Sequence, residues 1–207
     1  TYERALGGGI DFALDMPLRK PGAYQLRVVV RDTATARLGA AGQFVEVPAL
    51  GNGRLALSGV VVNGSRAAAA SVNTGAPPPA PAGDDANAQN DEPDAQASPA
   101  VRRFRPQSSL NYAYVVFNAR LDKQTGQPRL TARVRLLRDG GEVFASDDAP
   151  LSFGAQSDTA RLLAGGSVRL GAGLDPGEYI LQIVVTDKLA DPKHHAAAQW
   201  IDFEIVK

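Results

Sequence analysis

The chain has 207 residues, 22 acidic and 22 basic side chains, and 44% hydrophobic residues. Its length admits one large or two small domains with a real core, and its zero net charge provides no field that would draw it to nucleic acid, an anionic membrane or an acidic substrate. The lack of cysteine excludes disulfides, zinc–cysteine sites and a thiol nucleophile, and it is compatible with export.

The first clear element follows Pro21-Gly22, a dipeptide that favours a tight turn because proline presets φ and glycine accepts a positive φ. From Tyr24 to Asp32 apolar residues alternate with polar ones, which predicts a strand with one buried face. A tyrosine directly after such a turn is typical of the tyrosine corner of immunoglobulin-like sandwiches, where its hydroxyl bonds to backbone a few residues upstream. We therefore interpret Tyr24 as structural. A polar loop then leads to a second strand at Gln43–Val47.

Arg54–Val62 is predicted to be one strand, and the following Ser65–Ala100 is predicted to be a disordered insert. The insert has six prolines and no aromatic residue, so it cannot bury enough apolar area to offset its ordering entropy. Its acidic residues lack the carboxylate spacing, central glycine and closing glutamate of an EF-hand-like calcium loop, and we interpret them as part of a solvated tether. These residues are Asp84, Asp85, Asp91, Glu92 and Asp94.

Order is predicted to resume at the basic run Arg102–Arg105. Ser109–Asn118 has the β-branched and aromatic content of a central strand, and Leu130–Leu137 alternates apolar and polar residues. Arg138–Glu142 contains Asp-Gly, which supplies the positive φ angles of a primed hairpin turn. Val143–Phe144 then begins the return strand.

The end of the chain repeats its beginning. Pro176–Asp187 matches Pro21–Asp32, so that Tyr179 stands where Tyr24 stands. Gln199–Phe203 matches the strand at 43–47 across a loop expected to be one residue longer. Upstream, Arg161–Leu170 has a counterpart at 3–10. Such self-similarity indicates two related β-modules in series.

The predicted fold is all-β, with two immunoglobulin-like β-sandwich modules in tandem. Residues 54–207 supply about seven strands, enough for a sandwich that carries the disordered insert 65–100. Residues 1–50 supply only the last strands of a module. The first module is therefore expected to be truncated, with its missing strands before Thr1.

The candidate chemical sites are weak, and the sequence predicts no catalytic residue, cofactor or metal. His194 and His195 are neighbours on a loop, so in an extended segment they point to opposite faces and cannot readily share a metal. The glycines at 7–9 and 165–166 lack the context of a phosphate-binding loop and are interpreted as tight connections. Asp147 and Asp148 lie in a polar loop without sign of a cleft.

Five residues are candidates for a protein interface. Alternation places Phe44 and Trp200 on the outward face of equivalent strands, where aromatic residues mark a contact between modules or a partner patch unless flanking strands cover them. Arg102, Arg103 and Arg105 could meet an acidic partner, the acidic tether or nucleic acid, but the charge balance argues against nucleic acid. Their simpler interpretation is a strand entrance with solvated arginines.

Four stretches together resemble the C-terminal region of the von Willebrand factor A-related proteins of acidobacteria. They are KPGAYQLRVVVRD, QFVEVPALGNGRLALSGVVV, AVRRFRPQSSLNYAYVVFNARLD and QWIDFEIVK. The resemblance implies an exported protein with an upstream A domain followed by immunoglobulin-like modules. The A domain's Asp-x-Ser-x-Ser metal motif is absent from these residues, so no functional residue of the family carries over.

The expected function is that of a non-enzymatic, extracytoplasmic scaffold or adhesion stalk with an unidentified protein partner. The longest apolar stretches have only strand length, so no membrane span is expected. An alternative is an accessory, carbohydrate-binding-like sandwich of a secreted hydrolase. Sugar binding favours a row of exposed planar aromatics, yet this chain has 6% aromatic residues and one tryptophan.

Overall fold

The computed structural model describes residues 14, 16–18, 20–65, 95–154, 156 and 158–207. These residues form twelve strands and two short 3-10 helices, which confirms the all-β prediction for this part of the chain. No helix among them has the length and hydropathy needed to cross a membrane. Three predictions lie outside the described residues: the repeat counterpart at 3–10, the glycines at 7–9, and the disorder of the insert over residues 66–94 with its acidic residues.

The strands form three sheets. The first is a hairpin of β1 (Gly22–Arg31) and β2 (Leu38–Val47). The second contains β3 (Ala56–Leu57), β4 (Val61–Ser65), β6 (Ser109–Phe117) and β10 (Arg161–Arg169). The third contains β5 (Arg103–Phe104), β7 (Leu130–Arg138), β8 (Gly141–Ala145), β9 (Ala149–Pro150), β11 (Gly177–Asp187) and β12 (Ala196–Ile205). The helices are η1 (Leu50–Asn52) and η2 (Ala95–Ala97).

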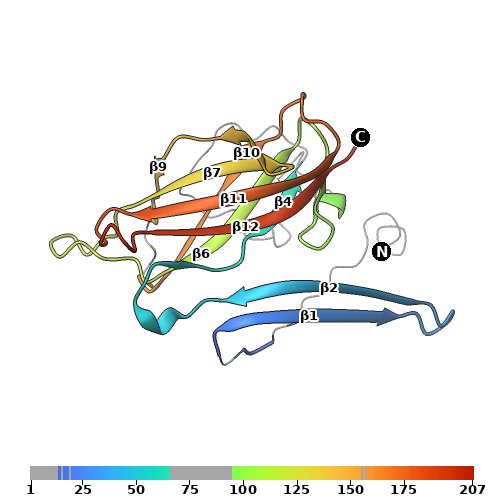
Figure 1. Cartoon of the computed structure of the whole chain (residues 1–207), viewed down its shortest axis with the longest axis horizontal. Coiled ribbons are helices and arrows are strands. Elements are labelled where there is room, and N and C mark those ends of the chain that lie inside the picture. Colours follow the sequence, from blue (N-terminus) through green and yellow to red (C-terminus); the bar gives the residue numbers. More distant parts are fainter. Residues whose placement is uncertain (1–13, 15, 19, 66–94, 155, 157) are drawn as a thin grey trace, which may run out of the picture.

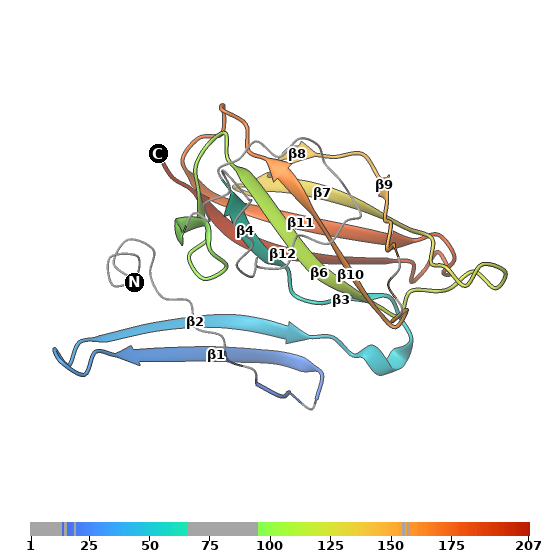
Figure 2. The ribbon, with the colours of Figure 1, turned by 180° about the vertical axis from the view of Figure 1, so that it is seen from behind.

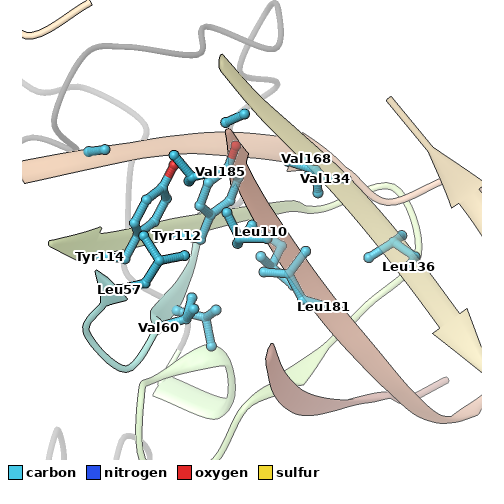
Figure 3. Close-up of a cluster of buried hydrophobic side chains, with 14 of the residues drawn as sticks. Leu57, Val60, Leu110, Tyr112, Tyr114, Val134, Leu136, Val168, Leu181 and Val185 are labelled. Atoms are coloured by element: carbon cyan, nitrogen blue, oxygen red, sulfur yellow. The ribbon is translucent and has the colours of Figure 1, made fainter. Parts of the chain in front are cut away.

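The second and third sheets pack face to face around one apolar core, and together they are called the β3–β12 body (Figure 1). Each central strand contributes every second residue to this core, as period-two alternation predicts. The close-up in Figure 3 shows how side chains of both sheets meet there. The buried rows are Leu110, Tyr112, Tyr114 and Val116 of β6, and Tyr179, Leu181, Ile183 and Val185 of β11.

The strand predicted at Arg54–Val62 is interrupted. Leu57 pairs with Val116 and Val61 with Ala113, so this side has one more residue than β6 between the two pairs. At the interruption the Ser58 hydroxyl accepts a hydrogen bond from the Val115 amide at 2.8 Å. This irregularity is a bulge between β3 and β4, with a side-chain oxygen in the place of a backbone acceptor.

Two further predictions need correction. The predicted disordered insert ran to Ala100, but η2 packs on the body and Ala97 is only 3% exposed. It covers Gly64, where an added Cβ would lie 2.4 Å from that of Ala97. Gly165 and Gly166 are not a tight connection, because both lie within β10. A Cβ on Gly166 would lie 2.4 Å from the hydroxyl of Tyr112, so this glycine makes room for a core tyrosine.

The two terminal hairpins share the predicted corner. The turn glycines have φ angles of 144° at Gly22 and 141° at Gly177, values that suit glycine. The hydroxyl of Tyr24 donates to the carbonyl of Lys20 at 2.8 Å, and that of Tyr179 donates to the carbonyl of Asp175 at 2.9 Å. Both tyrosines therefore bind backbone four residues upstream, as predicted.

The strand pairing corrects the alignment of the second strands. Gly22 pairs with Val47, 25 residues later, and Gly177 pairs with Ile205, 28 residues later. The second connection is thus three residues longer, whereas the sequence comparison predicted one. Phe44, opposite Gln25, corresponds to Asp202, opposite Ile180. A shift of two residues leaves every side chain on its original face, so alternation alone could not reveal it.

Candidate interaction surface

The apolar row of β1 is exposed, which contradicts the prediction that its face is buried. Leu26, Val28 and Val30 are 37%, 49% and 67% exposed. The corresponding residues of β11 are Leu181, Ile183 and Val185, and each is 0% exposed. Burying such a side chain contributes about 1.5–3 kcal/mol, a gain that the hairpin lacks at these positions.

The difference arises from what lies beside each hairpin. β7 pairs with β11 over eight residues, Ile180 to Asp187, and the sheet of β6 and β10 faces it. Among the described residues, no strand pairs with the outer edge of β1, and the hairpin makes no extended contact with another element. Figures 1 and 2 show β1 and β2 to one side of the β3–β12 body.

The opposite face of the hairpin is also rich in exposed apolar groups. Phe44, Leu38 and Val29 are 77%, 70% and 65% exposed. The strand pairing places Arg27 and Arg31 on this same face, because they alternate with the apolar row. The hairpin therefore presents apolar side chains on both faces and two arginines on one.

A second surface runs along the outward face of β12. Trp200, Asp202 and Glu204 follow one another there, and Trp200 is 60% exposed. Arg102 pairs with Asp202 at 2.9 Å, and Arg103 pairs with Glu204 at 2.8 Å. The structure thus places Trp200 and two predicted interface arginines along the same face of β12, although ion pairs within the chain engage both arginines.

The other two predicted interface residues lie apart from this group. Arg105 follows β5 with an exposed side chain, and its carbonyl accepts hydrogen bonds from Ser108. Phe44 belongs to β2, on the separate hairpin. Phe44 and Trp200 are both outward-facing as predicted, but they occupy different positions of the two hairpins. The assignment of these five residues to an interface stays a prediction.

The attachment of the hairpin to the body depends on a residue that the sequence did not single out. The Asn118 side-chain amide donates to the carbonyls of Leu50 at 2.8 Å and Arg54 at 3.0 Å. Asn118 itself has a positive φ of 59°, a conformation that asparagine tolerates better than most residues. It therefore fastens the connecting segment to the end of β6. An asparagine at the end of a strand was the only signal for this role.

Equivalent aspartates organise the loops at the ends of the two hairpins. Asp32 accepts hydrogen bonds from the Thr35 hydroxyl and from the amides of Ala34 and Thr35, and these bonds lower its pKa. Asp187 is 1% exposed and accepts from the amides of Leu189 and Arg120 at 2.9 and 2.8 Å. Both residues fix loop backbone, which is a structural use of a carboxylate.

The histidines lie on the loop after Asp187. The His195 ring bonds to the carbonyl of Pro192, and His194 is exposed. Within the described ranges, no group of three or more His, Asp or Glu side chains could hold a metal ion. Asp147 and Asp148 lie between β8 and β9, and Asp148 pairs with Arg133 at 3.0 Å.

Comparison with protein-family models and with curated proteins finds no match for this chain.

Proposed function

We propose that this chain is a non-catalytic, extracytoplasmic segment of a von Willebrand factor A-related protein, and that it acts as a scaffold or adhesion stalk through protein contacts. The observation that carries the proposal is the hairpin of β1 and β2, which no other described element covers. The residues that are buried in β11 are exposed in β1, although both hairpins have the same local geometry. A surface of this kind marks a protein interaction site.

The strand order supports an immunoglobulin-like sandwich for the β3–β12 body. One sheet runs β4–β6–β10, and the other runs β8–β7–β11–β12 with β5 parallel to β12. This order corresponds to the A–B–E and C′–C–F–G arrangements of that fold, with β11 and β12 as strands F and G. The tyrosine corner at the start of β11 has the position expected in strand F.

The location and the family come from the sequence resemblance, which also implies an upstream A domain. In that arrangement the modules hold a neighbouring domain at a distance and offer surfaces for assembly. The alternative carbohydrate-binding function has less support, because Phe44 and Trp200 lie on different hairpins and do not form one aromatic row.

Site-specific photo-crosslinking tests the interaction role. A photoreactive phenylalanine analogue is placed at Phe44 in the full-length protein in its native cells, and at Phe144 in a matched control. Phe144 is 41% exposed on β8, away from the hairpin. We expect a discrete cross-linked protein from position 44 alone. Equal products from both positions, or none from position 44, would contradict the proposal.

A further inference from the structure

We propose that the outer edge of β1, which no described strand pairs with, binds an extended segment of a partner protein, which adds as an antiparallel strand and carries two carboxylates four residues apart between alternating apolar residues. This inference rests on the proposed interaction function and specifies its surface and the chemistry of its partner. It follows from the edge, from the comparison with β11, and from the charges of β1.

The edge itself is suited to strand addition. β1 pairs with β2 over ten consecutive residues without a bulge, and it contains no proline. Protein edge strands are usually kept short or interrupted by prolines, bulges or inward charges, because an open row of backbone groups pairs with other strands. The long regular edge of β1 lacks these interruptions. Its remaining protection is the charge of Arg27 and Arg31, which repels basic strands and leaves the edge open to β-augmentation by an acidic one.

The equivalent hairpin shows which edge is used and in which direction. In the third sheet, β7 pairs antiparallel with β11 over eight residues, whereas β12 takes only the two residues of β5 on its other edge. The edge of β1 corresponds to the one that β7 covers. A strand placed there as β7 lies on β11 would set apolar residues beside Leu26, Val28 and Val30.

The charges of β1 determine how the side chains of a matching strand must differ from those of β7. Gln182 of β11 stands opposite Arg135 of β7, and its Oε1 accepts from the arginine Nη1 at 2.7 Å. The register places Arg27 of β1 at the position of Gln182. An arginine opposite Arg27 would bring two like charges together, whereas a carboxylate there would form a favourable cross-strand pair.

Arg31 also favours a carboxylate on the matching strand. It corresponds to Thr186 of β11, which stands opposite Thr131 of β7. Arg27 and Arg31 lie on one face of β1, four residues apart, so a matching strand carries its two carboxylates with the same spacing. Between them, the alternate positions are apolar and cover the exposed row.

The test uses two dye-labelled peptides based on β7, Leu130–Arg138, and the full chain. The acidic peptide carries Thr131→Glu and Arg135→Glu, opposite Arg31 and Arg27, and the basic peptide carries Thr131→Lys and keeps Arg135. Binding is measured by fluorescence polarisation. We expect the acidic peptide to bind about tenfold more tightly, because opposite charges across a strand pair attract and like charges destabilise it.

Charge reversal in the chain provides the decisive comparison. The double variant Arg27→Glu, Arg31→Glu is expected to reverse the order of the two peptides. The control variant Arg161→Glu, Arg169→Glu has the same change in net charge at two exposed positions of β10 and is expected to preserve the order. An unchanged order in the β1 variant, or a reversed order in the control, would overturn the proposal.

Three further results distinguish strand addition by a partner from self-association, from pairing with a preceding strand and from contacts made elsewhere on the hairpin. Sedimentation that shows a dimer of the chain which Arg27→Glu, Arg31→Glu dissociates would place a second copy on this edge and overturn the proposal. So would a form of the protein extended before Thr1 that no longer binds the acidic peptide, because a preceding strand of the same chain would then pair with this edge. A cross-linked partner at Phe44 together with peptides that bind equally would preserve the interaction role and reject strand addition at β1.

Discussion

Removing the hydroxyl of each corner tyrosine tests whether the two hairpins contribute equally to stability. In Tyr179→Phe the ring remains and two hydrogen bonds are lost, one to the carbonyl of Asp175 at 2.9 Å and one from Arg138 Nη1 at 3.0 Å. A neutral hydrogen bond contributes about 1 kcal/mol and one to a charged group about 1.5–3 kcal/mol. Since Tyr179 is 2% exposed, water does not readily replace them, and we expect a loss of about 2.5–4 kcal/mol.

Tyr24→Phe is the matched control, because it removes the same hydroxyl from a bond of 2.8 Å to Lys20. Tyr24 is half-buried on the hairpin of β1 and β2, so the loss of its hydroxyl should change the stability of the body by less than about 0.5 kcal/mol.

The measurement is urea unfolding followed by the fluorescence of Trp200, the single tryptophan, which lies on β12. With an m-value of about 2–3 kcal/mol/M, Tyr179→Phe should lower the midpoint by about 1 M at an unchanged slope. Equal shifts for Tyr24→Phe and Tyr179→Phe would refute the reasoning, and so would an unshifted Tyr179→Phe.

Three other outcomes follow from the structure. Gly166→Ala should cost about 1–3 kcal/mol of stability in the same denaturation assay, because the added methyl group overpacks against the Tyr112 hydroxyl. Adding Tyr112→Phe should recover part of the loss. Gly171→Ala is the control and should have little effect, because a Cβ there meets no other atom within 4 Å. Burial raises the pKa of Tyr112 to about 12 and also raises the pKa of Tyr114. The stability that comes from keeping these phenols neutral is therefore present below pH about 10 and is lost as the pH rises towards 12. Absorbance at 295 nm should show that the ionisation missing from Tyr112→Phe and Tyr114→Phe occurs above pH about 10 and together with unfolding; its occurrence near pH 10 in the folded protein would contradict this. Residues 54–207 should unfold at nearly the midpoint of the whole chain, because the hairpin makes no extended contact with the body, and a large decrease would show that the hairpin supports the body.

The local features of the fold could be predicted from the sequence because short segments determine them. Asp139 and Gly140 have φ angles of 51° and 77°, as a primed turn requires. The tyrosine corners form in both hairpins, whether or not anything covers them. Each of these features depends on residues within about five positions of one another.

Features that join distant segments could not be predicted in this way. Arg102 and Arg103 find their carboxylates on β12, about a hundred residues away, so their pairing is invisible in the run itself. Gly166 resembles a turn glycine until its partner on β6 is known. The register of β2 was ambiguous by two residues, because that shift preserves the alternation on which the prediction depended.

The two hairpins separate what the local sequence encodes from what its neighbours contribute. Both have the same turn, corner and pairing, yet one row of apolar side chains is buried and the other is exposed. The alternation therefore specifies an apolar face that another element can bury, and that element must lie outside the hairpin. The replacement of Gln182 by Arg27 at equivalent positions is the informative difference, because a copy of β7 would place its Arg135 against that charge. The strand that suits β1 is therefore a different strand from β7, and an acidic one.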